Sequence, residues 1–237
     1  MLEIENLNAG YGRLHVLFDI NTKIKDKEIT VLVGPNGSGK STLLKTVMGI
    51  TQIYSGRITF NGNDIAGLPP HAVTRLGIAY LPQVGNVFAN LKVWENLLMA
   101  GYILNKSERK ERVDEVLEAF PILKNYLDKK AGMLSGGERQ MLAMAMALMR
   151  RPQIMLFDEP TASLAPKIAY EVLDKIVNLR DEHGMTLVIA EQNARRALER
   201  GDQAILLVSG KVVYDGESKE LLSHPELGQV YLGVKKA

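Results

Sequence analysis

The sequence contains no cysteine among its 237 residues. Disulfide bonds, thiol catalysis and cysteine-based zinc sites are therefore excluded, and the composition is compatible with a reducing compartment. An excess of charge is also lacking: 29 Lys and Arg residues stand against 27 Asp and Glu residues, and the net charge of +2 is too small to indicate a nucleic acid as partner. The four histidines show no metal-ligand spacing, and we expect each on the surface or in a turn: His15, His71, His183 and His224.

Long hydrophobic runs are missing as well. A transmembrane helix needs about 18 or more consecutive apolar residues, and the most apolar run, Met141–Met149, has half that length. We interpret this run as a buried helix rich in Ala and Met. The first residues, Met1–Asn6, do not combine a basic start with an apolar run, so no signal peptide is expected. We therefore expect one large domain, residues 1–237, that does not cross a membrane by itself.

The most informative stretch is a glycine-rich segment that fits the phosphate-binding pattern G-x-x-x-x-G-K-[ST] at every fixed position. Its residues are Gly34, Pro35, Asn36, Gly37, Ser38, Gly39, Lys40, Ser41 and Thr42. The apolar, β-branched run Glu28–Val33 precedes it, and Leu43–Met48 follows with apolar residues at helical spacing. This strand, loop and helix context is the one that the pattern requires, so the segment is predicted to bind a nucleoside triphosphate.

The residue types in this phosphate loop suit a triphosphate. Several backbone N–H groups must approach the phosphates closely, and Gly34, Gly37 and Gly39 carry no Cβ that would obstruct them. The positive end of the following helix dipole points to the same anion. Lys40 is expected to reach the β- and γ-phosphates, and the Ser41 hydroxyl to ligate Mg²⁺.

Two further apolar segments end in polar side chains. Ile154–Phe157 is continuously apolar, as in a central parallel strand, and Asp158 and Glu159 follow it. Ligands of open α/β sheets bind at the carboxyl ends of the strands. We therefore expect Asp158 to hold Mg²⁺ and Glu159 to polarise the attacking water. The strand predicted at Gly77–Leu81 likewise places Gln83 where it can reach a bound ligand.

The first residues predict antiparallel strands. Apolar and polar residues alternate in Leu2–Leu7 and in Ile20–Ile24. Tyr11 lies in a turn between glycines, where its ring can stack on an adenine, although an exposed turn tyrosine is an equally good interpretation of this stretch alone.

The pattern becomes helical after Leu91 and contains no strand for about fifty residues. Ser107 is expected to cap the second helix of this region. We predict a fold of the α/β class, in which residues 1–84 and 146–237 form the core and residues 85–145 form an inserted helical subdomain.

A second polar, glycine-rich helix start stands at Ser135, Gly136 and Gly137. The free backbone N–H groups at a helix N-terminus form a potential anion site. Taken alone, this segment indicates a helix cap and nothing more.

In this order, the phosphate loop, Gln83, Leu134–Glu138 and the pair Asp158 and Glu159 resemble the ATPase subunits of ATP-binding cassette transporters. The resemblance covers essentially the whole chain, and the Ser-Gly-Gly signature separates this family from other P-loop proteins. It implies a RecA-like P-loop NTPase core with an N-terminal antiparallel β subdomain and an inserted α-helical subdomain. It also implies ATP and Mg²⁺ as cofactors.

The resemblance assigns further roles. In such ATPases two subunits pair head to tail, and each nucleotide is held between the phosphate loop of one and the signature of the other. By this likeness Ser135 and Gly137, with Gly136 between them, contact the γ-phosphate bound to the partner. Gln83 couples the Mg²⁺ site to the helical subdomain, and Tyr11 stacks on adenine.

Two positions depart from the usual pattern of the family. The strand after the acids normally ends in a switch histidine that contacts the γ-phosphate, and here that position holds Gln192. The loop after Pro160 normally ends in an aspartate, and here it reads Ala162–Pro166. A neutral amide donates a hydrogen bond to phosphate but carries no charge. We predict that Gln192 senses the γ-phosphate.

These departures, with Val87–Leu97 after Gln83, resemble the LivF-type ATPases of branched-chain amino acid importers. That resemblance implies a second ATPase subunit, two transmembrane permeases and, indirectly, a periplasmic binding protein, with this chain peripheral on the cytoplasmic face of the inner membrane. Importers of urea or short amides share these features. Two other classes remain as alternatives: a soluble cassette ATPase without a permease, and a P-loop kinase, in which the signature would have no purpose.

Overall fold

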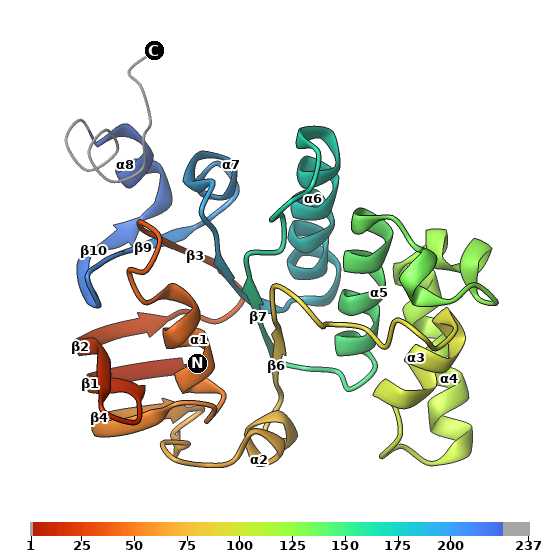
Figure 1. The fold of residues 1–237 in the computed structure, drawn as a ribbon, viewed down its shortest axis with the longest axis horizontal. Coiled ribbons are helices and arrows are strands. Elements are labelled where there is room, and N and C mark those ends of the chain that lie inside the picture. Colours follow the sequence, from red (N-terminus) through yellow and green to blue (C-terminus); the bar gives the residue numbers. More distant parts are fainter. Residues whose placement is uncertain (1, 225–237) are drawn as a thin grey trace.

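The fold consists of two β-sheets and a group of helices (Figure 1). The computed structural model describes residues 2–224, and Met1 and residues 225–237 lie outside the described part. Its strands are β1 (Leu2–Tyr11), β2 (Leu14–Ile24), β3 (Ile29–Val33), β4 (Gln52–Phe60), β5 (Asn63–Asp64), β6 (Ile78–Leu81), β7 (Ile154–Asp158), β8 (Thr186–Ala190), β9 (Gln203–Val208) and β10 (Lys211–Glu217). Its helices are α1 (Lys40–Val47), α2 (Pro70–Arg75), α3 (Val93–Ala100), α4 (Lys106–Ala119), α5 (Gly136–Leu148), α6 (Pro166–His183), α7 (Ala194–Leu198) and α8 (Ser218–Ser223), with 3₁₀ helices η1 (Pro121–Tyr126) and η2 (Ala131–Met133).

The central sheet has the strand order β10-β9-β3-β8-β7-β6. Strands β9 to β6 in this order run parallel, and β10 is an antiparallel edge strand. Every residue of β3, β7 and β8 is buried, which explains why four of the five residues in each strand are apolar. The carboxyl ends of β3, β6, β7 and β8 meet along one edge of the sheet, where ligands of such folds bind. The predicted α/β class is confirmed.

The second sheet is antiparallel, with the order β2-β1-β4-β5, and lies at one end of the molecule (Figure 1). The antiparallel strands predicted near the N-terminus are confirmed. The second of them begins at Leu14 rather than at Ile20. The reason is an irregularity at Asp19, whose φ is 51°: it separates the buried residues Leu17 and Ile20 by three positions instead of two, and so interrupts the alternation.

Two hydrophobic cores lie on opposite faces of the central sheet. Leu32 and Leu156 point to one face, where they belong to the core that the antiparallel sheet and α1 also form. Val31 and Phe157, their neighbours along the strands, point to the other face and pack against helices α3 to α6. Strand side chains alternate between the two faces, so both sets must be apolar. The sheet is thus fixed from both sides, and its carboxyl edge stays in place.

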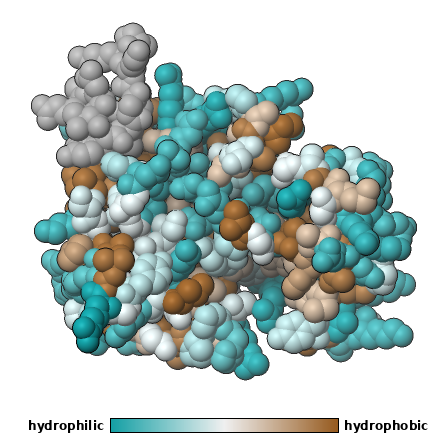
Figure 2. All heavy atoms as spheres, viewed as in Figure 1, coloured by the Kyte–Doolittle hydropathy of each residue, from teal (hydrophilic) through white to brown (hydrophobic). Residues whose placement is uncertain are grey.

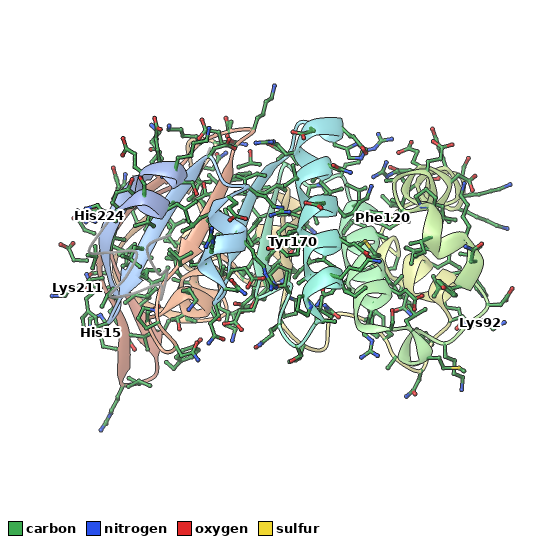
Figure 3. All side chains as sticks on the ribbon, turned by 90° about the horizontal axis from the view of Figure 1, so that it is seen from above. His15, Lys92, Phe120, Tyr170, Lys211 and His224 are labelled. Carbon is green, nitrogen blue, oxygen red and sulfur yellow. The ribbon has the colours of Figure 1, made fainter. Side chains whose placement is uncertain are left out.

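The helices between β6 and β7 occupy the end of the molecule opposite the antiparallel sheet (Figure 1). Figure 2 shows a hollow between this helical part and the main body. Figure 3 shows the two ends of the molecule from above: Lys92 lies at the helical end, and His15 and Lys211 lie at the opposite end.

Two polar side chains fasten the helical part internally. Asn96 on α3 is fully buried, and its amide accepts from the Phe88 N–H at 2.8 Å and donates to the Phe88 carbonyl at 3.1 Å. Arg112 on α4 donates to the carbonyls of Leu148 and Met149 at the C-terminal end of α5. The loop before α3 and the end of α5 are therefore held by hydrogen bonds as well as by apolar packing.

Several helix boundaries differ from the expectation. Helix α4 begins at Lys106, and Asn105 is its N-cap because the Asn105 side chain accepts from the Glu108 N–H at 2.9 Å. The expectation that Ser107 caps this helix is wrong. Helices α2, α7 and α8 are not predicted, since six residues or fewer form less than two turns and show no helical period. Within residues 2–224, no helix combines the length and the apolar character that spanning a bilayer requires.

Candidate functional site

The polar residues predicted at strand ends lie together at the carboxyl edge of the central sheet. Strand β3 leads into the phosphate loop, and β6 and β7 lead to Gln83 and Glu159. A backbone hydrogen bond joins the loop after β7 to the end of β8, because the Glu159 N–H donates to the Ala190 carbonyl at 2.8 Å. The site is therefore built on neighbouring, hydrogen-bonded strands.

The phosphate loop has a backbone that only glycine accepts easily at two positions. Gly34 has a φ of 148°, and a Cβ there would lie 2.0 Å from the Leu207 carbonyl oxygen. Gly39 has a φ of 105°, and a Cβ there would lie 2.8 Å from a methyl carbon of Leu17. The Gly210 N–H donates to the Ser38 carbonyl at 2.9 Å and holds the loop to the turn after β9. Larger residues at the two glycines would displace the loop.

Lys40 begins helix α1 and is buried, at 5% exposure. Its Nζ donates to the carbonyls of Gly34 at 2.8 Å and Pro35 at 3.2 Å, so the ammonium group lies against its own loop. Burial lowers the pKa of Lys40, and the nearby carboxylates, Glu159 first, oppose this effect by raising it. The loop therefore presents a positive charge that water covers little.

The buried hydroxyl of Ser38 indicates whether the loop suits an anion. Among the buried side-chain nitrogen and oxygen atoms of residues 2–224, the Ser38 hydroxyl oxygen has no hydrogen-bond partner in the protein. Buried polar groups normally have one. With the N-terminus of α1 and the Lys40 ammonium beside it, this hydroxyl fits a ligand rich in acceptor oxygens.

Ser41 and Asp158 face each other across the site. The Ser41 hydroxyl donates to one Asp158 carboxylate oxygen at 2.6 Å, and the Tyr80 hydroxyl on β6 donates to the other at 2.9 Å. Burial and the Asp158 carboxylate raise the pKa of Tyr80, which keeps this donor protonated. Sequence reasoning finds Ser41 and Asp158 and misses Tyr80, whose strand gives no sign that its side chain reaches the acid.

A divalent cation at this point would need ligands from the substrate. In the described part of the chain, no group of three His, Asp or Glu side chains is arranged to hold a metal ion. Ser41 and Asp158 supply two oxygen ligands, which suits Mg²⁺ because this ion is usually held by one or two carboxylates together with waters and phosphate oxygens.

Glu159 stands next to this pair in an unusual backbone conformation. Its φ is 50°, a left-handed value that is costly for a residue other than glycine and occurs often at functional sites. The Gln83 side-chain amide donates to its carboxylate at 3.0 Å. Gln83 therefore contacts the acid pair directly, through Glu159.

Glu191 and Thr161 are polar residues of the site that sequence reasoning misses. Glu191 is 3% exposed, and one of its carboxylate oxygens accepts from both the N–H and the hydroxyl of Thr161, at 3.0 and 2.7 Å. Burial raises the pKa of Glu191 and the nearby Glu159 adds to this, whereas the Thr161 hydrogen bonds act in the opposite direction. The available signal was a charged residue directly after four consecutive apolar ones, Leu187–Ala190.

The other predicted residues lie outside this hydrogen-bonded cluster. Gln192 is exposed in the loop between β8 and α7. Tyr11 ends β1 and is 42% exposed, so its ring face is accessible to a planar ligand. Both positions are compatible with their predicted roles, but no hydrogen bond tests either one.

Ser135 caps helix α5, which lies in the helical part of the molecule. Its hydroxyl accepts from the Glu138 N–H at 3.3 Å, and its N–H donates to the Glu138 carboxylate at 2.8 Å, which forms a capping box. A Cβ on Gly136 or Gly137 would lie 2.6 or 2.5 Å from side-chain carbons of Leu164 or Ile168. The two glycines therefore permit close packing of α5 against the start of α6.

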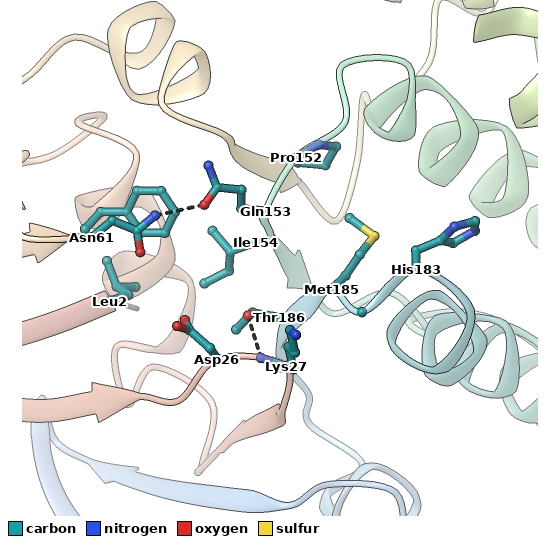
Figure 4. A pocket seen from close by; sticks show the side chains of 12 residues that line it. Leu2, Asp26, Lys27, Asn61, Pro152, Gln153, Ile154, His183, Met185 and Thr186 are labelled. Atoms are coloured by element: carbon teal, nitrogen blue, oxygen red, sulfur yellow. Dashed lines mark hydrogen bonds between the residues drawn. The ribbon is translucent and has the colours of Figure 1, made fainter.

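A separate cavity lies at the opposite edge of the central sheet (Figure 4). Its volume is about 320 Å³, and residues at the start of β7 and β8, Ile154 and Thr186, contribute to its lining. The phosphate loop and the acid pair do not line it. This cavity is therefore not part of the candidate site.

The chain matches the family model described as ABC transporter over residues 17–162. It is 53% identical over 234 residues to the probable branched-chain amino acid transport ATP-binding protein LivF of Archaeoglobus fulgidus, with 99% of each chain covered. It is also 41% identical over 233 residues to the high-affinity branched-chain amino acid transport ATP-binding protein BraG of Pseudomonas aeruginosa, with 98% of this chain and 100% of that protein covered.

Solved structures share the fold. A nucleotide-free ATP-binding cassette from an ABC transporter has a TM-score of 0.87 at 26% identity, covering 100% of this chain and 99% of that one. An ATP-binding cassette in a dimeric, post-hydrolysis state with ADP and phosphate has a TM-score of 0.79 at 26% identity, covering 92% of this chain and 99% of that one.

Proposed function

The chain belongs to the ABC transporter family, and from this premise we propose that it hydrolyses MgATP to drive the import of branched-chain amino acids. Both relatives named for branched-chain amino acid transport match nearly its full length. The observation that carries the proposal is the 2.6 Å hydrogen bond between Ser41 and Asp158. This bond joins the phosphate loop to the acid strand, which is the arrangement that a nucleotide with its metal ion needs.

Binding of the nucleotide is assigned to the phosphate loop, Gly34–Thr42, and to Tyr11. The backbone N–H groups of the loop and the start of α1 would receive the phosphates, and the buried Ser38 hydroxyl lies among them. Lys40 would exchange its bonds to two loop carbonyls for bonds to phosphate oxygens. The exposed ring of Tyr11 would stack on the adenine.

The residues that would hold Mg²⁺ are Ser41, Asp158 and Gln83. The first two already contact each other, and Gln83 contacts the adjacent Glu159. The bound ion supplies charge neutralisation for the phosphate oxygens. Tyr80 keeps the Asp158 carboxylate in place by a hydrogen bond to the oxygen that does not contact Ser41.

Hydrolysis is assigned to Glu159, Lys40 and Gln192. The Glu159 carboxylate orients a water molecule for in-line attack on the γ-phosphorus and accepts its proton, while the bond to the bridging oxygen breaks. Lys40 stabilises the negative charge on the phosphate oxygens. The side-chain amide of Gln192 donates an N–H hydrogen bond to a γ-phosphate oxygen. The contact with Gln83 limits the orientations of the Glu159 carboxylate.

We assign the rest of the site to a second subunit, in a head-to-tail pair that is either homo- or heterodimeric. Ser135, Gly136 and Gly137 stand on α5, which packs against α3, α4 and α6 of its own chain. They would therefore complete the site of the partner rather than their own. A related cassette described as dimeric in a post-hydrolysis state supports this assignment.

Permease subunits are the partners that the family implies, and we propose where they dock. A cavity of about 420 Å³ lies between the core and the helical subdomain that we assign to residues 85–145, and α2, β6, α3 and α5 line it (Figure 2). Phe88, Met99 and Tyr102 in its lining are strongly exposed apolar side chains. Such anchors suit a cytoplasmic permease loop, so the chain would be peripheral at the inner face of the membrane.

The proposal is tested by isolating the tagged chain from detergent-solubilised membranes and reconstituting what co-purifies into lipid vesicles. We expect two integral permeases and a second ATPase subunit in the complex. ATP turnover should rise when a periplasmic binding protein loaded with leucine, isoleucine or valine is added. Stimulation by urea or short amides instead would assign the chain to those importers. Recovery only in a complex without permeases would contradict an import function.

A further inference from the structure

The buried carboxylate of Glu191 has no role in the hydrolysis derived above. It lies directly after β8 and is 3% exposed. Burying a carboxylate is costly unless hydrogen bonds compensate for the lost water. The contacts that Glu191 makes at the carboxyl edge of the sheet are therefore informative.

The first contact is to the turn that carries Glu159. Thr161 donates its N–H and its hydroxyl to the same Glu191 oxygen, at 3.0 and 2.7 Å. The Ala162 N–H donates to the Glu159 carbonyl at 3.1 Å and closes the turn between them. Because Thr161 is only two residues from Glu159, the Glu191 carboxylate holds one side of this turn in place.

The second contact is to the loop that carries Gln192. The Glu191 N–H donates to the Leu32 carbonyl of β3 at 3.1 Å, and Gln192 is the next residue in the chain. The backbone position of Gln192 therefore depends on the same residue that holds Thr161. A single residue links the two loops to which hydrolysis is assigned.

The helices beyond these loops are joined as well. Tyr170 lies near the N-terminal end of α6 (Figure 3), and the guanidinium groups of Arg196 and Arg200 lie over its ring, at 4.8 and 5.1 Å from the ring centre. Arg200 also forms an ion pair with Asp174 on α6 at 2.7 Å. The Glu159 turn and the Gln192 loop are thus joined by the Glu191 bonds. The segments that follow them, α6 and the region of Arg196 and Arg200, are joined by the Tyr170 and Asp174 contacts.

We propose that Glu191 is a positioning residue for ATP hydrolysis. By holding Thr161, it keeps the Glu159 carboxylate and Gln192 in the positions from which they act on the γ-phosphate. This inference rests on the proposed ATPase function. Thr161 lies outside the phosphate loop and makes none of the nucleotide contacts assigned above. Loss of its bond to Glu191 therefore lowers kcat and leaves nucleotide affinity unchanged.

The test compares Thr161→Val with Thr161→Ser in the full chain. Valine keeps the side-chain volume and removes the hydroxyl that donates to Glu191, whereas serine keeps the hydroxyl. We expect kcat to fall about tenfold in Thr161→Val, as for the loss of a hydrogen bond to a charged group, with KM for MgATP within about twofold. Thr161→Ser should restore kcat to within about twofold of the wild type.

Thr186→Val is the matched control. Thr186 lies at the other end of β8, is buried, and its hydroxyl accepts from the Lys27 N–H at 2.9 Å (Figure 4). Its replacement should lower Tm by a similar amount without changing kcat. If Thr161→Val does not fold, Glu191→Gln and Glu191→Leu replace it. Glutamine keeps an acceptor for Thr161 and should retain most of the turnover that leucine loses.

Two outcomes overturn the inference and are distinguishable. A wild-type kcat in Thr161→Val, or a change in KM alone, overturns it while the ATPase function stands. A wild-type chain that hydrolyses no ATP in its complex overturns the proposed function, and the inference with it.

Discussion

The hydroxyl of Ser41 donates a 2.6 Å hydrogen bond to the carboxylate of Asp158, a residue 117 positions later in the chain. The bond joins the start of α1, which follows β3, to the end of β7, although β8 lies between β3 and β7 in the sheet. The second Asp158 oxygen accepts from Tyr80 on the edge strand β6. Asp158 is therefore positioned from both sides.

Asp158→Asn should abolish most of the Mg²⁺-dependent turnover. The substitution removes the only carboxylate assigned to the metal and keeps the shape of the side chain. We expect turnover to fall about 100-fold or more, with a higher Mg²⁺ concentration at half-maximal rate. The measurement is ATP turnover in a Mg²⁺ titration. Tyr80→Phe removes only the supporting hydrogen bond, so a loss as large as that in Asp158→Asn would contradict the assignment.

Glu159→Gln should keep ATP binding and lose turnover. The amide preserves the side-chain volume but cannot accept the proton of the attacking water. A loss of about 10²- to 10⁴-fold in kcat is expected for removal of a general base. Equilibrium binding of ATP, measured by calorimetry, should stay within about twofold of the wild type. Normal ATPase activity in this variant would refute the assignment.

Lys40→Ala should weaken nucleotide binding itself. A hydrogen bond to a charged group contributes about 1.5 to 3 kcal/mol, so the dissociation constant for ATP should rise about 10- to 150-fold. Lys45→Ala is the control, because Lys45 lies in the last turn of the same helix, where basic residues favour the helix dipole. Equal ATP affinity in the two variants would exclude the role of Lys40 in the phosphate loop.

Specific ATPase activity should rise with protein concentration, because in the proposed head-to-tail pair each site needs the Ser135 end of α5 from a partner. Ser135→Ala should abolish this rise as well as lower turnover. The same substitution removes a helix cap, which alone costs about 1 kcal/mol of stability.

Asn105→Ala is the control for the lost cap. Asn105 caps α4 by the same type of bond, to the Glu108 N–H, and belongs to no proposed site. Its replacement should reduce the free energy of unfolding similarly and leave turnover unchanged. Turnover that is independent of protein concentration in the wild type would contradict the half-site arrangement.

The raised pKa of Glu191 predicts how stability depends on pH. The carboxyl group has a usual pKa of 4.5 and a higher pKa in the folded chain, since burial disfavours its charge. Between these two values the folded state binds more protons than the unfolded state. This contribution to the free energy of unfolding is therefore fully present below pH 4.5 and is lost as pH rises through the folded pKa.

Urea unfolding at several pH values measures this effect. Glu191→Gln lacks the titrating group, so the decline of its unfolding free energy with pH should be shallower than in the wild type. Parallel curves for the two proteins would show that Glu191 does not titrate with a raised pKa.

The sequence reveals the parts of the site that are encoded locally. The phosphate loop is a continuous segment whose glycines need positive φ, and the acids follow a buried strand, so both leave a pattern along the chain. Tyr80 and Thr161 leave none. Their partners, Asp158 and Glu191, are 78 and 30 residues away. Such contacts depend on which parallel strands are neighbours and in which register, and the composition of a single strand does not specify either.

The fold shows the same division. Continuous apolar strands and long helices are predictable, whereas the break at Asp19 and the short helices α2, α7 and α8 are not, because one irregular residue or a single turn carries no period. The glycines of the signature are another example. Their sequence suggests an anion site, and the structure adds a packing reason, the close approach of Leu164 and Ile168.

Helix α5 connects the end held by Arg112 to the end capped by Ser135. An α-helix rises about 1.5 Å per residue, so its 13 residues form a rod of roughly 20 Å. A tilt of about 10° at the Arg112 end would displace Ser135 by roughly 3 Å, the length of one hydrogen bond. A slight rotation of α5 where it meets α4 would therefore be enough to change the distance between the signature and the nucleotide that, in the proposed pair, the neighbouring subunit holds.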